Sequence, residues 1–440
     1  MNLKKAKIIR DRLLSMLYPA FQLSDIQEQV FCESWEKRSY REMATRLGYE
    51  HDYIRQIGAQ LWKMLSQATG KTVTKRNLHT VLQEEYCRWQ EARQVPTCWQ
   101  DWGEATNVSQ FWGREAELET LKRWVLSDHC SLVGIVGFGG VGKTALSVKF
   151  SQEVQQEFEV LIWRSLRDRP PLLRLLADIL SVINYTQTVT VEPSETRMLS
   201  MLIKVLQQRR CLLVLDNWDT VLDPRRECLK LYQSGYEGYG ELLKYIGEIQ
   251  HQSCAIVTSR EKPHEIATLE GELLPVRILK LGGITETAGA KLIEDKGLQA
   301  ISTDVNKLVN YYRGNPLAIK MAVANIKELC LENVNDFWSK NQMICGGICQ
   351  LIQPQLEGLS DLERQMLYTL AKSYQPLAIA FWQNIPSSTN ADQIIKALRF
   401  LEERSLIEKQ EPGYLLPPAI AEYINITPEF CPFCMEFMNP

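Results

Sequence analysis

The feature that most constrains the fold is the glycine-rich segment at residues 137–144, which reads Gly-Phe-Gly-Gly-Val-Gly-Lys-Thr. An apolar run at residues 132–136 precedes it, and the residues from Ala145 onward have a helical pattern. The glycines let successive backbone N–H groups hold phosphate oxygens, and the N-terminus of the following helix adds positive partial charge. Lys143 then reaches the β- and γ-phosphates, while the Thr144 hydroxyl binds Mg²⁺. The segment therefore predicts a site for a purine nucleoside di- or triphosphate. The predicted contacts are Gly137, Gly139, Gly140, Val141, Gly142, Lys143, Thr144 and Ala145.

Four apolar runs between residues 111 and 282 indicate buried strands. They cover residues 132–136, 160–163, 211–215 and 255–258, and stretches with helical spacing separate them. Continuous apolar runs are typical of strands that are buried on both faces, as in a parallel sheet covered by helices. We therefore predict an α/β P-loop nucleotide-binding domain with a parallel sheet at residues 111–282.

Acidic residues follow the run at residues 211–215. Asp216 stands directly after it, where a P-loop protein needs a second ligand for Mg²⁺; the alternative is an acid in a turn after a buried strand. The next residue is Asn217, whose amide cannot accept a proton as a general base. Fast hydrolysis is therefore not expected, unless Asp219 takes over the role of the base.

Arg260 follows the run at residues 255–258, and only Ser259 separates it from that run. A cation at the end of a strand beside the phosphate site can contact a γ-phosphate and so distinguish ATP from ADP. The alternative is a solvated arginine at a strand end.

The regions on both sides of this domain read as helical. At residues 1–90, Ser24 with Gln27 and Ser39 with Glu42 form two capping boxes, and a short helix, a turn at Gly48 and a longer helix give a helix-turn-helix pattern. Residues 91–110 are predicted as a linker. Downstream we predict an all-α helical domain at residues 283–350 and a winged helix at residues 351–426, with a tail at residues 427–440.

Composition adds limits on location and partners. The net charge of the chain is -3, but residues 1–90 carry 15 Lys and Arg against 10 Asp and Glu, which hints at an anionic partner for that region. The sequence has no transmembrane run and no apolar signal segment, so we expect a cytoplasmic protein with reduced cysteines and no membrane partner. Cys431 and Cys434 form a lone CxxC pair, which is more often inert than a metal or redox site.

The order of the motifs resembles NB-ARC proteins of the STAND class of signalling NTPases. The likeness covers residues 111–423, with segments at 111–115, 158–165, 212–219, 258–260 and 314–318 that resemble the motifs of this class. The resemblance implies that Trp112 and Arg114 lie at the adenine end and that Pro316 packs on the adenine. It also implies an ATP/ADP-dependent switch that holds Mg²⁺, forms nucleotide-dependent homo-oligomers and acts through a protein partner.

A closer likeness is to bacterial proteins that join a helix-turn-helix head, an NB-ARC domain, a winged helix and a repeat array. Segments 236–241, 251–254 and 258–263 carry it. Two departures stand out: Pro417 occupies the position at which the family's winged helix offers a histidine to the diphosphate, and the sequence stops at Pro440 without a repeat array. We therefore expect a weakened resting state. We also expect either a short form or truncated remnant of this architecture, or a sensor that is a separate chain.

The N-terminal region leaves its output open. As a DNA-binding head, residues 24–66 would present Arg55, Gln56 and Lys63, but Asp52 would repel phosphate. The alternatives are a protein-interaction module and a structural cap. For the whole chain, the leading hypothesis is a nucleotide-dependent signalling switch; the others are an ATPase with turnover as its purpose and a nucleotide-regulated DNA-binding transcription regulator.

Overall fold

The computed structural model describes residues 3–17, 23–94, 98–183, 194–224, 231–299, 301–339, 343–344, 347–373, 375–383 and 390–427. Its contacts divide the chain into two units, Met1–Thr97 and Cys98–Pro440, called here unit 1 and unit 2. Cys431 and Cys434 lie outside the described residues. In the part of the chain that is described, no helix combines the length and the apolar character that crossing a membrane requires.

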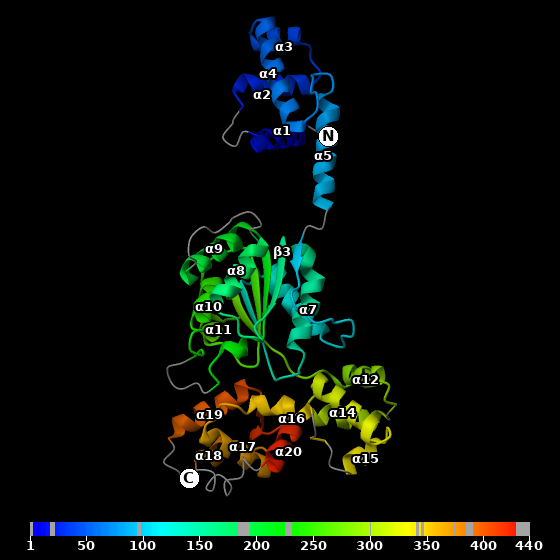
Figure 1. Ribbon diagram of the computed structural model, residues 1–440, viewed down its shortest axis with the longest axis vertical. Helices are drawn as coiled ribbons and strands as arrows, with labels where there is room; N and C mark the ends of the chain where they lie inside the picture. The colour runs from blue at the N-terminus through cyan, green and yellow to red at the C-terminus, as the bar shows by residue number, and fades with distance from the viewer. Residues whose placement is uncertain are drawn as a thin grey trace. The chain divides into compact units, whose positions relative to one another are not determined.

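Unit 1 is all helical (Figure 1). Both predicted capping boxes are present, at Ser24 and Ser39. The helix that begins after Ser39 ends at Gly48, whose φ of 73° is the left-handed conformation that glycine tolerates. The helices are α1 (Leu3–Leu17), α2 (Asp25–Trp35), α3 (Tyr40–Leu47), α4 (His51–Thr69) and α5 (Leu78–Gln94).

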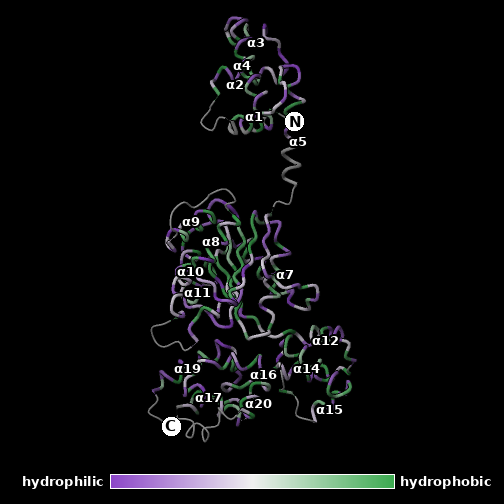
Figure 2. The backbone as a smooth tube through the Cα atoms, in the orientation of Figure 1, coloured by the Kyte–Doolittle hydropathy of each residue, from purple (hydrophilic) through white to green (hydrophobic). Residues whose placement is uncertain are grey.

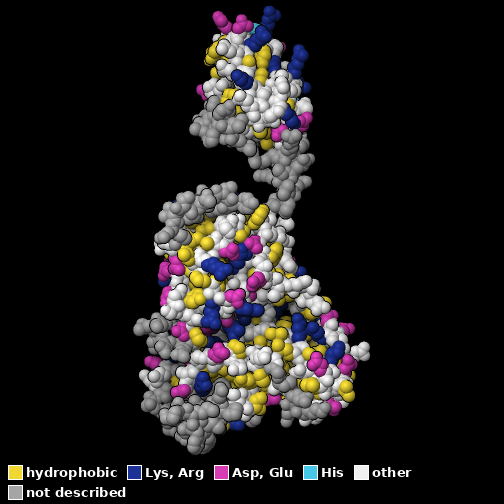
Figure 3. Space-filling model, viewed as in Figure 1, with side chains coloured by type: hydrophobic (Ala, Val, Ile, Leu, Met, Phe, Trp, Pro, Cys, Tyr) yellow, Lys and Arg dark blue, Asp and Glu magenta, His cyan; other side chains and the backbone are white. Residues whose placement is uncertain are grey.

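Helix α4 buries one face and exposes the opposite one. Its buried side chains include Ile54, Ile57, Leu61, Trp62 and Leu65, while Arg55, Gln56 and Lys63 are exposed. Figure 3 shows both basic and acidic side chains on the face of unit 1 in view. The exposed surface is therefore mixed in charge, as the sequence indicated.

Unit 2 contains a six-stranded parallel sheet with strand order β1-β3-β4-β5-β2-β6 (Figure 1). The four predicted runs are β2, β3, β4 and β5, and Figure 2 shows these strands as the most hydrophobic part of unit 2. The edge strand β1 comes from residues 91–110, which we predicted as a linker; it pairs with β3. The strands are β1 (Trp99–Asp101), β2 (Leu132–Val136), β3 (Val160–Ser165), β4 (Cys211–Asp216), β5 (Cys254–Ser259) and β6 (Val276–Lys280).

Helices cover both faces of the sheet, so alternate residues of each strand enter different cores. On β4, Leu212 and Val214 pack with α6 and α7, whereas Leu213 and Leu215 pack with the helices of the other face. Figure 1 shows the second set of helices on the opposite side from α7. The elements are α6 (Glu115–Lys122), η1 (Arg123–Ser127), α7 (Lys143–Val154), η2 (Gln155–Glu157), α8 (Leu172–Ile183), α9 (Glu195–Gln208), η3 (Trp218–Val221), α10 (Gly238–Glu248) and α11 (His264–Leu269).

The C-terminal half of unit 2 is a single hydrophobic core built from helices and one hairpin. Three helices, α17 to α19, precede the antiparallel pair β7 and β8, which is the element order of a winged helix. Helix α20 follows. The elements are α12 (Glu286–Asp295), α13 (Ser302–Tyr311), α14 (Pro316–Leu329), α15 (Val334–Ser339), α16 (Gly347–Ile352), η4 (Gln353–Gln355), α17 (Asp361–Ser373), α18 (Ile379–Gln383), α19 (Ala391–Glu403), β7 (Glu408–Gln410), β8 (Gly413–Leu415) and α20 (Pro418–Ile426).

Candidate functional site

The glycine-rich segment forms a loop between β2 and α7, as predicted. A side chain at Gly137 would place its Cβ 2.5 Å from the carbonyl oxygen of Leu281, so no larger residue fits there. Gly142 has a φ of 104° and directly precedes α7, a conformation open to glycine at little cost. Both glycines are therefore required by the path of the loop.

Lys143 is the first residue of α7, and its ammonium group turns back over the loop. Nζ donates hydrogen bonds to the carbonyl oxygens of Gly137 (2.7 Å) and Phe138 (3.0 Å). Burial of the ammonium group lowers its pKa to about 8; the carboxylate of Asp219 opposes this shift and the charge of Arg260 adds to it. A bound phosphate would favour the charged form and raise this pKa again.

Thr144 and Asp216 lie together, as the two predicted Mg²⁺ ligands should. The Thr144 hydroxyl donates to Oδ1 of Asp216 at 2.8 Å, and the Thr258 hydroxyl from β5 donates to the same oxygen at 2.5 Å. Burial raises the pKa of Asp216, while the hydroxyls of Thr258 and Thr144 and the charge of Lys143 hold it down. A carboxylate beside a hydroxyl is the oxygen donor set that Mg²⁺ prefers, so these residues fit the ion.

The residues after Asp216 have other partners. The Asn217 amide donates to Oδ2 of Asp216 at 2.8 Å, so it faces that carboxylate. The Asp219 carboxylate accepts from the backbone N–H of Arg260 at 3.1 Å and pairs with its Nε at 3.2 Å. Asp219, predicted as a substitute base, is thus engaged by Arg260, the residue predicted to contact the γ-phosphate.

Arg260 lines a polar cavity of about 330 Å³ at the end of the sheet. Its side chain keeps 39% of its surface exposed. The same cavity is lined by Gln355 of η4 and by Arg404, which follows α19. Arg404 is buried and pairs with the buried Glu261 at 3.3 Å. Glu261, the residue directly after Arg260, therefore connects the end of β5 to the C-terminal helices.

The residues predicted at the adenine end surround a second cavity, of about 150 Å³, on the other side of the loop. Trp112, Arg114 and Pro316 line it together with residues of the loop and of α7. Loop residues Gly140, Val141 and Gly142 and the α7 residue Ala145 complete the predicted set. The fold thus brings residues from three distant segments to one place.

Arg114 lines this cavity and also makes several hydrogen bonds. Its guanidinium donates to the carbonyl oxygens of Gly282 (2.6 Å), Val141 (3.0 Å) and Gly283 (3.3 Å), and it pairs with Glu117 at 2.8 Å. It is buried. The side chain therefore fixes the phosphate loop to the connection that leaves β6, a bracing role that the sequence did not suggest.

Asn315 contacts the phosphate loop, a role that sequence reasoning missed. It caps α14 by accepting from the backbone N–H groups of Leu317 and Ala318, both at 3.1 Å. Its own amide donates to the carbonyl oxygen of Gly139 at 2.8 Å, and the N–H of Leu317 donates to Gly140 at 3.3 Å. An asparagine directly before a helix-starting proline is the available signal, because it predicts the cap.

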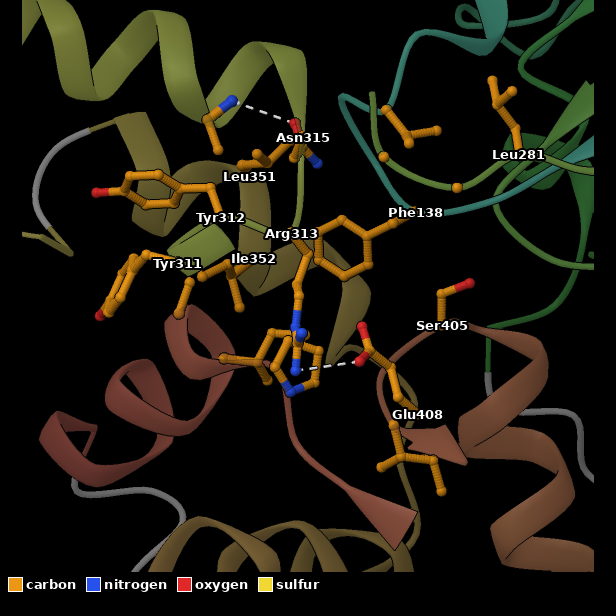
Figure 4. Close-up of a pocket in the computed structure, with 18 of the residues that line it drawn as sticks. Phe138, Leu281, Tyr311, Tyr312, Arg313, Asn315, Leu351, Ile352, Ser405 and Glu408 are labelled. Atoms are coloured by element: carbon orange, nitrogen blue, oxygen red, sulfur yellow. Dashed lines mark hydrogen bonds and ion pairs between the residues drawn. The ribbon is translucent and has the colours of Figure 1, made fainter. Parts of the chain in front are cut away.

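Pro417 does not lie in the cavity that Trp112 and Pro316 share. It lines another cavity, of about 500 Å³, together with Phe138 of the loop and Arg313. Figure 4 shows Arg313 reaching toward Glu408, with which it pairs at 3.2 Å. A proline has no side-chain donor, so Pro417 offers none to this cavity.

The described residues contain no group of three or more His, Cys, Asp and Glu side chains that could hold a metal ion. Seven cysteines whose side chains the structure describes are free thiols: Cys32, Cys98, Cys130, Cys211, Cys254, Cys330 and Cys349.

Comparisons with known proteins agree with this geometry. Residues 1–85 match the family model of the vWA-MoxR associated protein N-terminal HTH, and residues 114–234 match the NB-ARC domain. The chain is 37% identical over 376 residues to an uncharacterized WD repeat-containing protein of Nostoc sp. (strain PCC 7120), covering 82% of this chain and 29% of the relative. It is 29% identical over 199 residues to a probable disease resistance protein of Arabidopsis thaliana, covering 44% of this chain and 10% of the relative.

Among solved structures, a Walker-type ATPase of Pyrococcus abyssi superimposes with a TM-score of 0.53 at 15% identity, covering 74% of this chain and 99% of that one. This likeness shows the fold alone. The chain spans less than a third of the length of the two relatives above. The two matched family models show that the chain is an NB-ARC domain protein with an N-terminal helix-turn-helix domain.

Proposed function

We propose that the chain is an ATP/ADP-dependent switch that binds its nucleotide with Mg²⁺ at residues 137–144. One observation carries the proposal: the phosphate loop is hydrogen-bonded by the start of α14, through Asn315 and Leu317. A nucleotide that alters the loop therefore acts on the helices downstream. Lys143 and the loop N–H groups would hold the phosphates, and Thr144 with Asp216 would hold Mg²⁺, which screens phosphate charge when bound.

A switch requires the two nucleotides to favour different arrangements of the chain. We propose that ADP favours the arrangement in which the C-terminal helices contact the nucleotide-binding domain, and that ATP favours a more open one. Opening would permit homo-oligomerisation and engagement of a protein partner through unit 1. DNA binding by residues 24–66 is the alternative output, favoured by the helix-turn-helix match and the exposed Arg55, Gln56 and Lys63. A gel shift of the whole chain with duplex DNA, measured at several salt concentrations, decides whether DNA binding is the output.

Arg260 supplies a test of nucleotide discrimination. We expect Arg260→Ala to weaken Mg·ATP by about 10- to 150-fold, because a hydrogen bond to a charged group contributes about 1.5–3 kcal/mol. Mg·ADP, which lacks the γ-phosphate, should weaken much less. Calorimetric titrations of both nucleotides measure the difference, with the exposed Arg174 of α8 replaced by alanine as the control. Equal losses for ATP and ADP would show that Arg260 does not distinguish them.

Turnover separates a switch from an ATPase whose purpose is hydrolysis. The amide of Asn217 faces Asp216, and the carboxylate of Asp219 is engaged by Arg260, so neither is free to act as a base for water. We expect multiple-turnover ATP hydrolysis well below about 10 per second, the median rate of enzymes. A rate of tens per second in a steady-state phosphate assay would contradict this and favour the ATPase hypothesis.

A further inference from the structure

A buried glutamine lies against the phosphate loop without a hydrogen-bond partner. Gln355 ends the short helix η4, and only 2% of its surface is exposed. Its Nε2 belongs to the side-chain atoms that are buried and unpaired among the described residues. A buried amide donor without an acceptor is unfavourable, so we expect an acceptor within reach of Nε2.

The position of Nε2 indicates what that partner is. A Cβ built on Gly139 would lie 2.7 Å from Nε2, so the amide approaches the loop at a residue without a side chain. The carbonyl oxygen of Gly139 is already occupied by the Asn315 amide. Gln355 also lines the cavity that contains Arg260. The amide donor is therefore next to the predicted phosphate site, on the side of the loop where Arg260 lies.

The backbone of Gln355 is held by Arg404. Its carbonyl oxygen accepts from Nη1 of Arg404 at 3.3 Å, and the same Nη1 donates to the carbonyl oxygen of Glu357 at 2.8 Å. Arg404 is itself held by Glu261, which directly follows Arg260. Residues from the sheet and from the C-terminal helices together hold η4 against the phosphate loop.

We propose that Gln355 binds the terminal phosphate of bound ADP. Its Nε2 would donate a hydrogen bond to an oxygen of that phosphate. This inference rests on the proposed function. It assigns to η4 a direct contact between the C-terminal helices and the nucleotide, a contact that Pro417 has no donor to make. A nucleotide held in this arrangement would then contact both the nucleotide-binding domain and the C-terminal helices of unit 2.

The test compares Gln355 with Gln353, an exposed glutamine of the same helical turn. Mg·ADP is titrated calorimetrically into the full chain and its variants. Gln355→Met, which keeps the length of the side chain but removes the donor, should weaken binding about tenfold or more. Gln355→Glu, which places a carboxylate beside the phosphate, should weaken it further. Gln353→Met should bind within twofold of the unchanged chain.

Two results would overturn the inference. One is a Gln355→Met chain that binds Mg·ADP as the unchanged chain does; the other is an equal loss in Gln355→Met and Gln353→Met. If Gln355→Met does not fold, Gln355→Asn retains the amide but withdraws it by one methylene, and it should show the same tenfold loss. An unchanged chain that binds no Mg·ADP would instead overturn the proposed function, and the inference with it. Binding that is lost in Lys143→Ala but kept in Gln355→Met would overturn the inference alone.

Discussion

Replacing Lys143 with alanine is expected to lower the affinity for both Mg·ADP and Mg·ATP by at least about 100-fold. Nζ lies over the phosphate loop and donates hydrogen bonds to the carbonyl oxygens of Gly137 and Phe138. Each hydrogen bond from a charged donor to a phosphate contributes about 1.5–3 kcal/mol. The variant should stay folded, because these contacts lie within one loop. Calorimetric titration and the melting temperature measure the two effects.

The matched control is Lys149→Ala, on the same helix, whose ammonium group pairs with Glu153 at 3.3 Å. It should bind nucleotide as the unchanged chain does. The lowered pKa of Lys143, about 8, adds a second signature. Above that pH the free lysine loses its charge, so phosphate binding must also take up a proton and should weaken as the pH rises through 8. Lys143→Ala should lack this dependence, and unchanged ADP affinity in it would contradict the site.

The second large effect is expected at Arg404. Arg404 and Glu261 are 7% and 3% exposed and form a buried pair. Removing one partner of a buried pair is destabilising by about 3–5 kcal/mol. We therefore expect Arg404→Met to destabilise unit 2 by about this amount, and to loosen the contact between the C-terminal helices and the end of the sheet. Thermal and denaturant unfolding measure the loss.

Two further variants separate the buried pair from a general loss of charge. Arg399→Met changes an exposed arginine of α19, the helix that Arg404 directly follows, and should have little effect. The double variant Glu261→Met/Arg404→Met removes both charges and should recover much of the stability, because apolar side chains can replace a buried ion pair. An Arg404→Met chain as stable as Arg399→Met would show that the pair does not hold these elements together.

The parts of the fold that the sequence predicted are those set by local patterns. Apolar runs such as residues 211–215 mark strands because a strand buried on both faces must be apolar throughout. The phosphate loop is equally local, since its glycines, lysine and threonine are adjacent in the chain. The capping boxes at Ser24 and Ser39 belong to the same class, because both partners lie within three residues.

The parts that the sequence did not predict depend on contacts between distant residues. Strand β1 is a three-residue edge strand whose existence depends on pairing with β3, and nothing in residues 91–110 distinguishes it from a linker. Asn315 and Gln355 reach the phosphate loop from about 180 and 220 residues downstream. Only the packing of the C-terminal helices against the loop makes them part of the site.

Arg114 and Pro417 show a related limit of a resemblance. The family motif implies that Arg114 lies at the adenine end. In the structure it lines the same cavity as Trp112 and Pro316, and its donors are taken by three backbone carbonyl groups and Glu117. The resemblance sets Pro417 at the position of a histidine of the winged helix. Pro417 lines a cavity other than the one that Arg114 lines. A motif thus indicates where a residue lies, whereas its hydrogen bonds show what it does there.

The most direct test of the nucleotide-dependent switch is the nucleotide that the purified chain carries. Protein purified without added nucleotide is denatured, and the released adenine nucleotides are identified and quantified by chromatography, with Lys143→Ala treated in the same way. We predict close to one ADP or ATP for each unchanged chain and almost none for the variant. An unchanged chain that carries no nucleotide, and that takes up neither Mg·ADP nor Mg·ATP when titrated, would contradict the proposed switch.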